Sequence, residues 1–186
     1  MKTRPVDPTR LDVASFARDG GTLEGQTPLM SLERLSDSTH PDARPTEADM
    51  AHWTAKGENR PVRGGQPEVW LHVAAQATVS LVCQRCLSPV EAPLDAHRSF
   101  HFVSDETTAA QLDADSEDDV LALTRSLNLV SLVEDELLLA LPLVPRHEVC
   151  PEPLPMSHGD DEEGEEEAAP NPFAALAALK RGGPPN

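Results

Sequence analysis

Aromatic residues are scarce in this chain of 186 residues. Phe and Trp make up 3% of it, and tyrosine is absent, whereas proline occurs 18 times. A core without many rings has to be built from aliphatic side chains. A chain of this length can form one domain of about 100–150 residues with tails. We therefore expect a single domain with a modest aliphatic core.

Positive charge is also scarce, above all in the second half of the chain. Residues 1–103 contain 11 Lys and Arg against 13 Asp and Glu, whereas residues 104–186 contain 4 against 19, and the net charge is −17. Binding to phosphate backbones rests mainly on Lys and Arg. Any direct contact with nucleic acid is therefore expected to come from the first half.

Two further absences bear on where the protein acts. The N-terminal segment lacks the apolar core of about 7–15 residues that a secretory signal needs, and no run of about 18 apolar residues occurs. The three cysteines, an odd number, argue against a disulfide framework. We expect a cytoplasmic protein without a membrane partner, whose thiols are reduced or bound to metal.

The clearest pattern present is an alternation of apolar and polar residues. It runs from Val69 to Leu81 and again from Val90 to Phe102, with the period of a half-buried strand. The two runs flank Cys83–Pro89. We therefore predict an antiparallel β-hairpin with the Cys-Gln-Arg-Cys segment at its turn.

The first half gives weaker patterns elsewhere. A short strand is predicted within residues 27–35. Thr46, followed by acidic residues, is typical of a helix start, so we predict a helix to about Lys56 that Gly57 stops. Residues 58–67 contain Gly-Gly and two prolines and are predicted to form a loop.

The second half is predicted to hold one helix and a tail. Polar, acidic residues 104–119 are expected to be a mobile loop. Asn128 can cap a helix that presents one apolar face and runs to about Leu141. The acidic residues after it have no periodicity and are expected to be disordered. Asn171 then opens a short amphipathic helix typical of a docking peptide.

These elements predict the α+β class. We expect an antiparallel β-hairpin or sheet packed with a long apolar helix, plus a disordered acidic tail ending in a short helix. The expected domains are a single α+β domain at residues 1–150, an acidic linker at 151–170, and a docking helix with its tail at 171–186.

The cysteine pair is the strongest chemical motif. Cys83 and Cys86 at a hairpin turn can give two thiolates to one zinc ion, which needs four tetrahedral ligands. His147 and Cys150 are the remaining candidates, and together the four residues would form a Cys₃His site. Three reduced thiols beside a solvated His147 remain an alternative interpretation. A redox pair is disfavoured, because no helix N-terminus lies behind the cysteines to activate them.

Motifs of catalysis are missing. The sequence has no Gly-rich phosphate loop, no G-x-S-x-G and no H-E-x-x-H. Glu134, Asp135 and Glu136 form a run of carboxylates, but neighbouring helical residues diverge by about 100° and cannot all bind one Mg²⁺. We expect Glu134 or Glu136 to pair with Arg85 or Arg98, or to face water.

Four arginines of the first half could form a small RNA-binding patch. Stacking platforms for bases need aromatic rings, which this chain largely lacks, so the sequence argues against sequence-specific RNA binding. The basic residues that could form the patch are Arg60, Arg63, Arg85 and Arg98.

Three motifs, in a fixed order, resemble the YceD family. They are CQRCL, LVEDELLLALPLVPRHEVC and NPFAALAALK, and the similarity runs from about Glu68 to Arg181. The resemblance implies a non-enzymatic role in the synthesis, processing or stability of 23S ribosomal RNA in the cytoplasm. The family's motif positions correspond here to Cys83, Gln84, Arg85, Cys86, Glu134, Asp135, Glu136, Leu141, Pro142, Pro145, Cys150, Asn171, Pro172 and Phe173.

The partner implied by the resemblance is 23S rRNA or its precursor, bound directly or through a ribosomal protein. No small-molecule substrate is expected. Two other function classes stay open. One is a metal-dependent ribonuclease in rRNA processing. The other is an acidic escort that holds a basic ribosomal protein in solution, with acidic residues 160–167 as its contact.

Overall fold

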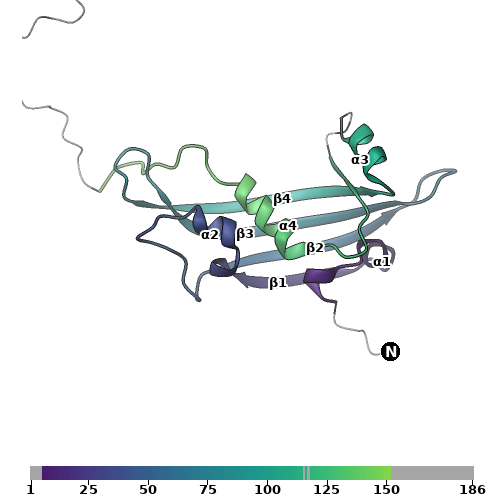
Figure 1. Ribbon diagram of the computed structural model, residues 1–186, viewed down its shortest axis with the longest axis horizontal. Helices are drawn as coiled ribbons and strands as arrows, with labels where there is room; N and C mark the ends of the chain where they lie inside the picture. Colours follow the sequence, from purple (N-terminus) through teal and green to yellow (C-terminus); the bar gives the residue numbers. More distant parts are fainter. Residues whose placement is uncertain (1–5, 115, 117, 152–186) are drawn as a thin grey trace, which may run out of the picture. The chain divides into compact units, whose positions relative to one another are not determined.

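A mixed five-stranded sheet organises the molecule (Figure 1). The computed structural model describes residues 6–114, 116 and 118–151, which belong to the first of two units, Met1–Pro151 and Glu152–Asn186. The strands follow one another in sequence order, antiparallel except for the last, which runs parallel to its neighbour. They are β1 (Thr22–Pro28), β2 (Met50–Arg60), β3 (Glu68–Val82), β4 (Pro89–Val103) and β5 (Asp119–Ala122).

This sheet with its few helices agrees with the predicted α+β class. Apart from Pro151, the predicted acidic linker and the predicted terminal helix lie outside the described residues. Within the part of the chain that is described, no helix combines the length and the apolar character needed to cross a membrane.

β3 and β4 form the long hairpin that the alternation predicted. Their antiparallel register runs from the Val69–Phe102 pair to the Val82–Pro89 pair, and Cys-Gln-Arg-Cys lies at the turn between them. Alternate residues of the two strands are buried on one face of the sheet, which gives the aliphatic core its floor. These residues are Leu71, Val73, Ala75, Ala77, Val79, Leu81, Ala92, Leu94, Ala96, Phe100 and Phe102.

The helix predicted from Thr46 to Lys56 is wrong. The backbone N–H and the hydroxyl of Thr46 both donate to the Asp49 carboxylate at 2.7 Å, which makes a local turn and not a helix cap. β2 follows, with buried Ala51, Trp53 and Ala55 alternating with exposed polar residues. The predicted loop at 58–67 is also too long, because β2 continues to Arg60.

Gly57 lies inside β2 and does not stop a helix. A Cβ at this position would lie 2.8 Å from the backbone N and Cα of Ala17, in α1 (Val13–Arg18). The missing side chain therefore lets the backbone of α1 pack directly on the strand. Asp12 caps α1 by accepting from the Ser15 N–H at 3.0 Å, and a short 3₁₀ helix, η1 (Pro8–Arg10), precedes it.

The strand predicted within residues 27–35 is correct only at its first two residues. β1 ends at Pro28 and is followed by η2 (Leu29–Ser31) and α2 (Glu33–Asp37). Leu29, Leu32 and Leu35 are all buried. Their spacing of three residues fits helical turns and does not fit the period of a strand.

α4 (Leu129–Leu139) packs against β3 and β4 (Figure 1). It begins at the predicted cap, since the Asn128 side chain accepts from the Ser131 N–H at 3.1 Å. It ends two residues before the expected Leu141 and, at 11 residues, is of ordinary length. Its own residues Leu129, Val133 and Leu137 are completely buried.

The prediction of one loop over residues 104–119 is wrong. They contain α3 (Glu106–Asp113), which Asp105 caps by accepting from the Thr108 N–H at 3.0 Å. Ala109 is its buried residue, and the helix packs against β5. An apolar face this small leaves almost no periodic signal in the sequence.

Candidate metal centre

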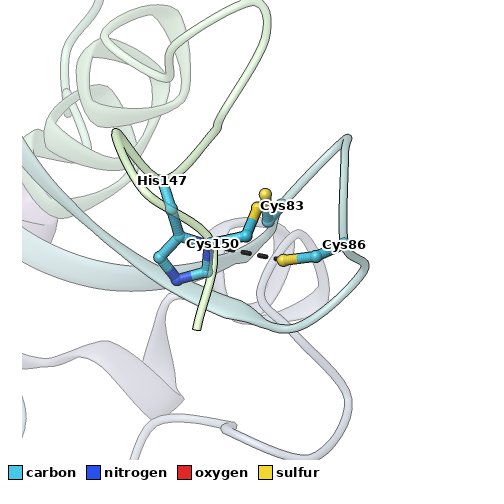
Figure 2. Close-up of side chains that lie close together, drawn as sticks. All are labelled: Cys83, Cys86, His147 and Cys150. Carbon is cyan, nitrogen blue, oxygen red and sulfur yellow. Dashed lines mark hydrogen bonds between the residues drawn. The ribbon is translucent and has the colours of Figure 1, made fainter. Parts of the chain in front are cut away.

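Cys83, Cys86, His147 and Cys150 meet at the turn between β3 and β4 (Figure 2). One ligand atom from each residue lies within 4.8 Å of those of the other three. Cys83 is buried, the other three are half-buried, and all three thiols are free. The structure therefore brings together the four residues that the sequence nominated as ligands.

The turn itself is a tight, hydrogen-bonded knuckle. The Cys83 N–H donates to the Ser88 carbonyl at 3.0 Å, and the Leu87 N–H donates to the Cys83 carbonyl at 2.9 Å. Leu87 closes the turn with a φ of +62°, in the left-handed region where glycine is the usual residue. The backbone thus curls around the sulfur of Cys83.

Hydrogen bonds fasten the segment after α4 to this turn. The Gln84 N–H donates to the Pro145 carbonyl at 2.9 Å. Arg85 donates from Nε to the Cys150 sulfur at 3.0 Å and from Nη2 to the His147 carbonyl at 3.5 Å. Arg85 therefore contacts this segment, and the expected pairing of Arg85 with Glu134 or Glu136 is wrong.

Backbone hydrogen bonds also lower the pKa of the first two thiols. Burial alone would raise the pKa of Cys83, but hydrogen bonds from the backbone of Cys86, His147 and Arg85 outweigh it and lower the pKa to about 5. The Ser88 backbone lowers the pKa of Cys86 in the same way. Both effects favour the thiolate, which is the form that binds metals.

The pKa values of the other two candidate ligands, Cys150 and His147, are raised. Burial raises the pKa of Cys150, although Arg85 opposes this rise. Hydrogen bonding to the Cys83 sulfur is the main cause that raises the pKa of His147. The sulfurs thus attract positive charge, which Arg85 and a protonated His147 can supply and which a divalent cation would supply more strongly.

Zinc fits this set of donors. Bonds of about 2.3 Å to sulfur and about 2.0–2.1 Å to nitrogen place tetrahedral ligand atoms about 3.6–3.8 Å apart. The Cys86 sulfur lies 3.5 Å from Nδ1 of His147, and the largest separation in the set, at most 4.8 Å, needs only a small adjustment. Three thiolates and one imidazole form a closed, structural type of site.

A histidine that the sequence did not single out supports the turn from below. His40 is 6% exposed. Its Nε2 lies 3.0 Å from the Leu87 carbonyl oxygen and its Nδ1 accepts from the Asp42 N–H at 3.1 Å. The backbone N–H of His40 donates to the Ser80 carbonyl at 2.7 Å. Residues 38–42 have no periodicity, so no signal in the sequence places this ring beneath the knuckle.

The three consecutive carboxylates of α4 do not converge. Glu134 and Asp135 both contact Arg34, whereas Glu136 lies 3.2 Å from Nε of Arg98. The expected pairing of Glu136 with Arg98 is therefore confirmed. Arg34, which lies 100 residues from Glu134, was not predicted as its partner, because no local pattern connects the two residues.

The four arginines considered for an RNA patch do not gather at one place. Arg60 ends β2 and Arg63 lies in the β2–β3 connection, where the Arg60 guanidinium stacks over the Trp70 ring at 4.1 Å. Arg85 lies at the opposite end of β3, beside the candidate metal ligands. Arg98 lies within β4. The four residues therefore do not form a single patch.

Comparison with known proteins identifies the family. Residues 71–180 match the family model of the Large ribosomal RNA subunit accumulation protein YceD. This segment is more than half of the chain and contains all four candidate ligands. The chain belongs to the YceD family. The resemblance seen in its three motifs is thereby confirmed.

A curated YceD relative gives a measure of the similarity. The Large ribosomal RNA subunit accumulation protein YceD of Haemophilus influenzae is 38% identical over 110 residues, which cover 57% of this chain and 62% of the relative. The match thus spans less than two thirds of that YceD protein. No solved structure matches the chain.

Proposed function

We propose that this chain supports the accumulation of 23S ribosomal RNA in the cytoplasm without catalysing a reaction. The observation that carries the proposal is the match to the YceD family over residues 71–180. The partner is 23S rRNA or its precursor, contacted directly or through a ribosomal protein. The match to the YceD relative covers 57% of this chain and 62% of the relative, so the role of the whole chain is inferred from the matched part.

Within this role, the four ligands at the hairpin turn hold a structural zinc ion. The geometry of the donors and the backbone N–H groups around Cys83 support this assignment. Zinc would fasten the segment after α4 to the tip of the β3–β4 hairpin, and so would keep both in one fixed arrangement.

Two features favour a binding factor over a ribonuclease. The carboxylates of Glu134 and Glu136 are engaged by different arginines, Arg34 and Arg98, so they do not form a Mg²⁺ site. A zinc ion with four protein ligands also has no open position for a nucleophilic water.

The test is the ratio of 23S to 16S rRNA in cells that lack the protein. We expect a depressed ratio that a wild-type copy restores. A copy with Cys83→Ser and Cys86→Ser should not restore it, whereas the exposed control His97→Ala should. A normal ratio in cells without the protein would overturn the proposed function.

A second measurement addresses the ribonuclease alternative. Purified protein is incubated with precursor 23S rRNA and Mg²⁺. The proposal predicts intact RNA. Cleavage that stops with Glu134→Gln or Glu136→Gln would favour a ribonuclease in its place.

A further inference from the structure

Exposed apolar side chains flank the candidate metal ligands along the chain. Leu87, Leu143, Val144 and Val149 are 69%, 100%, 55% and 84% exposed, and we name these four residues the apolar collar. Leu87 follows one ligand and Val149 precedes another, while residues 143–144 lead into the segment bonded to the turn. Leu139, at the end of α4, is also exposed. The other exposed large apolar residues of the described ranges are spread along the chain: Val6, Met30, Val62 and Leu112.

A groove of about 300 Å³ adjoins the collar. One wall is Val90–Pro93 of β4, and the other is the segment after α4, including Pro142, Val144 and Pro145. The charged residues along it are Glu91 and Arg146. A groove with aliphatic and proline walls can bury apolar side chains of a partner, and its polar edges can orient them.

Leu87 gives an independent reason to regard the collar as a contact surface. Its φ of +62° is strained for a residue with a side chain, and glycine would adopt it without strain. Its side chain is 69% exposed, so it adds little packing to the isolated unit. A strained residue that contributes little to folding is explained when its side chain acts in an interaction with another molecule.

The charge of the first unit indicates what kind of molecule that is. Residues 1–151 contain 13 Lys and Arg against 24 Asp and Glu, so the unit that carries the collar is acidic even when residues 152–186 are not counted. Such a unit repels phosphate backbones and further copies of itself, and attracts basic proteins. Apolar side chains bind by burial against other apolar groups, which protein surfaces offer and phosphates do not.

We propose that the apolar collar and its groove bind a basic protein that presents apolar side chains. Naming this partner as a protein of the large ribosomal subunit rests on the proposed function. Leu143 and Val149 insert into the partner's surface, and its Lys and Arg side chains face Glu91 of the groove and Glu148, which is exposed beside Val149. A metal bound by the four candidate ligands would hold the two halves of the collar, on the turn and after α4, in a fixed arrangement.

The test uses the full chain, immobilised, and the proteins extracted with lithium chloride from purified large ribosomal subunits. Retained proteins are identified, and the dissociation constant of each is measured with purified protein. Replacing Leu143 and Val149 by Ser should raise the constant about 10-fold or more, because both side chains are central to the contact. Replacing Met30 and Val62 by Ser, which are also exposed, should change it less than about two-fold.

Several outcomes would overturn the collar. One is that no basic subunit protein is retained, and another is that the collar and control variants bind it equally. Loss of 23S transcript binding in the collar variant would make the collar an RNA surface, and loss of a dimer in sedimentation would make it a contact between copies. If cells without the protein have a depressed 23S to 16S rRNA ratio and the collar variant restores it completely, the collar proposal is wrong and the proposed function stands. If the ratio is normal in cells without the protein, the proposed function is wrong, and the binding measurement alone decides on the collar.

Discussion

The carboxylate of Glu134 accepts hydrogen bonds from both the side chain and the backbone of Arg34. Nε and Nη2 of Arg34 donate to it at 3.1 and 2.8 Å, and the Arg34 N–H donates at 2.8 Å. The N–H of Leu35 donates as well, at 3.2 Å. These two residues lie in the first turn of α2, whose own preceding residue offers no side-chain cap. A residue of α4 thus caps α2.

Replacing Glu134 by Ala should therefore destabilise the fold. Two backbone N–H groups and one guanidinium lose their acceptor, so we expect the free energy of unfolding to fall by about 2–3 kcal/mol. Urea denaturation measures this change. Asp135→Ala is the matched control, because Asp135 is half-exposed and contacts the same Arg34; it should cost less than about 1 kcal/mol. Equal losses would mean that the ion pair matters and the cap does not.

Gly57→Ala tests the close contact between β2 and α1. The added Cβ would meet the Ala17 backbone at 2.8 Å, and backbone has little room to shift. We expect a loss of about 1–3 kcal/mol in the free energy of unfolding. Gly65→Ala is the control, because its Cβ would meet only ordinary contacts, at 3.5 Å or more. A stable Gly57→Ala protein would show that α1 can move away from the strand.

Zinc content gives a direct test of the metal centre. Protein purified without a metal-binding tag should contain one zinc ion per chain, measured by elemental analysis. Cys83→Ser should abolish it, whereas His97→Ala, an exposed histidine on β4, should leave it unchanged. Chelation of the zinc should also lower the midpoint of thermal unfolding, because the metal binds only the folded arrangement. Metal-free wild-type protein with the same midpoint would contradict the assignment.

His40→Ala tests whether the ring beneath the knuckle positions its ligands. Without the contact to the Leu87 carbonyl, the turn loses its buried partner. We expect the affinity for zinc to fall about 10-fold, a typical effect of groups that orient ligands without binding the metal. Competition with a chromophoric chelator measures this affinity. His52→Ala, exposed on β2, is the control, and an equal affinity for both variants would assign His40 to packing alone.

How far the sequence could predict the structure depended on the size of the side chains in each segment. The β3–β4 hairpin was predictable, because large aliphatic residues alternate with polar ones over its length. β2 has the same alternation, but Ala51, Ala55 and Gly57 fill most of its buried positions, and small residues carry little hydrophobic signal. The Thr46–Asp49 turn then imitated a helix cap. α3 was missed for a related reason, since its buried residue is Ala109.

The candidate metal ligands could be nominated from spacing alone, but their supporting residues could not. The two cysteines at the hairpin turn are three positions apart, and the chain offers one other Cys, with a histidine three positions before it, to complete a set of four ligands. His40 and the N–H groups around Cys83 are brought to their partners by the tertiary fold, as Arg34 is brought to Glu134. Nothing in their local sequence predicts those contacts.

The placement of the ligands along the chain has a consequence for the order of events during synthesis. Cys86 and His147 are 61 residues apart, and Cys150 is the last residue but one of the first unit. On a ribosome, the first pair of thiols emerges long before the second pair of candidate ligands. A metal ion could therefore be bound by all four residues only when β4, α3, β5 and α4 have all been made, and its binding would mark a chain in which the first unit has been synthesised to its end.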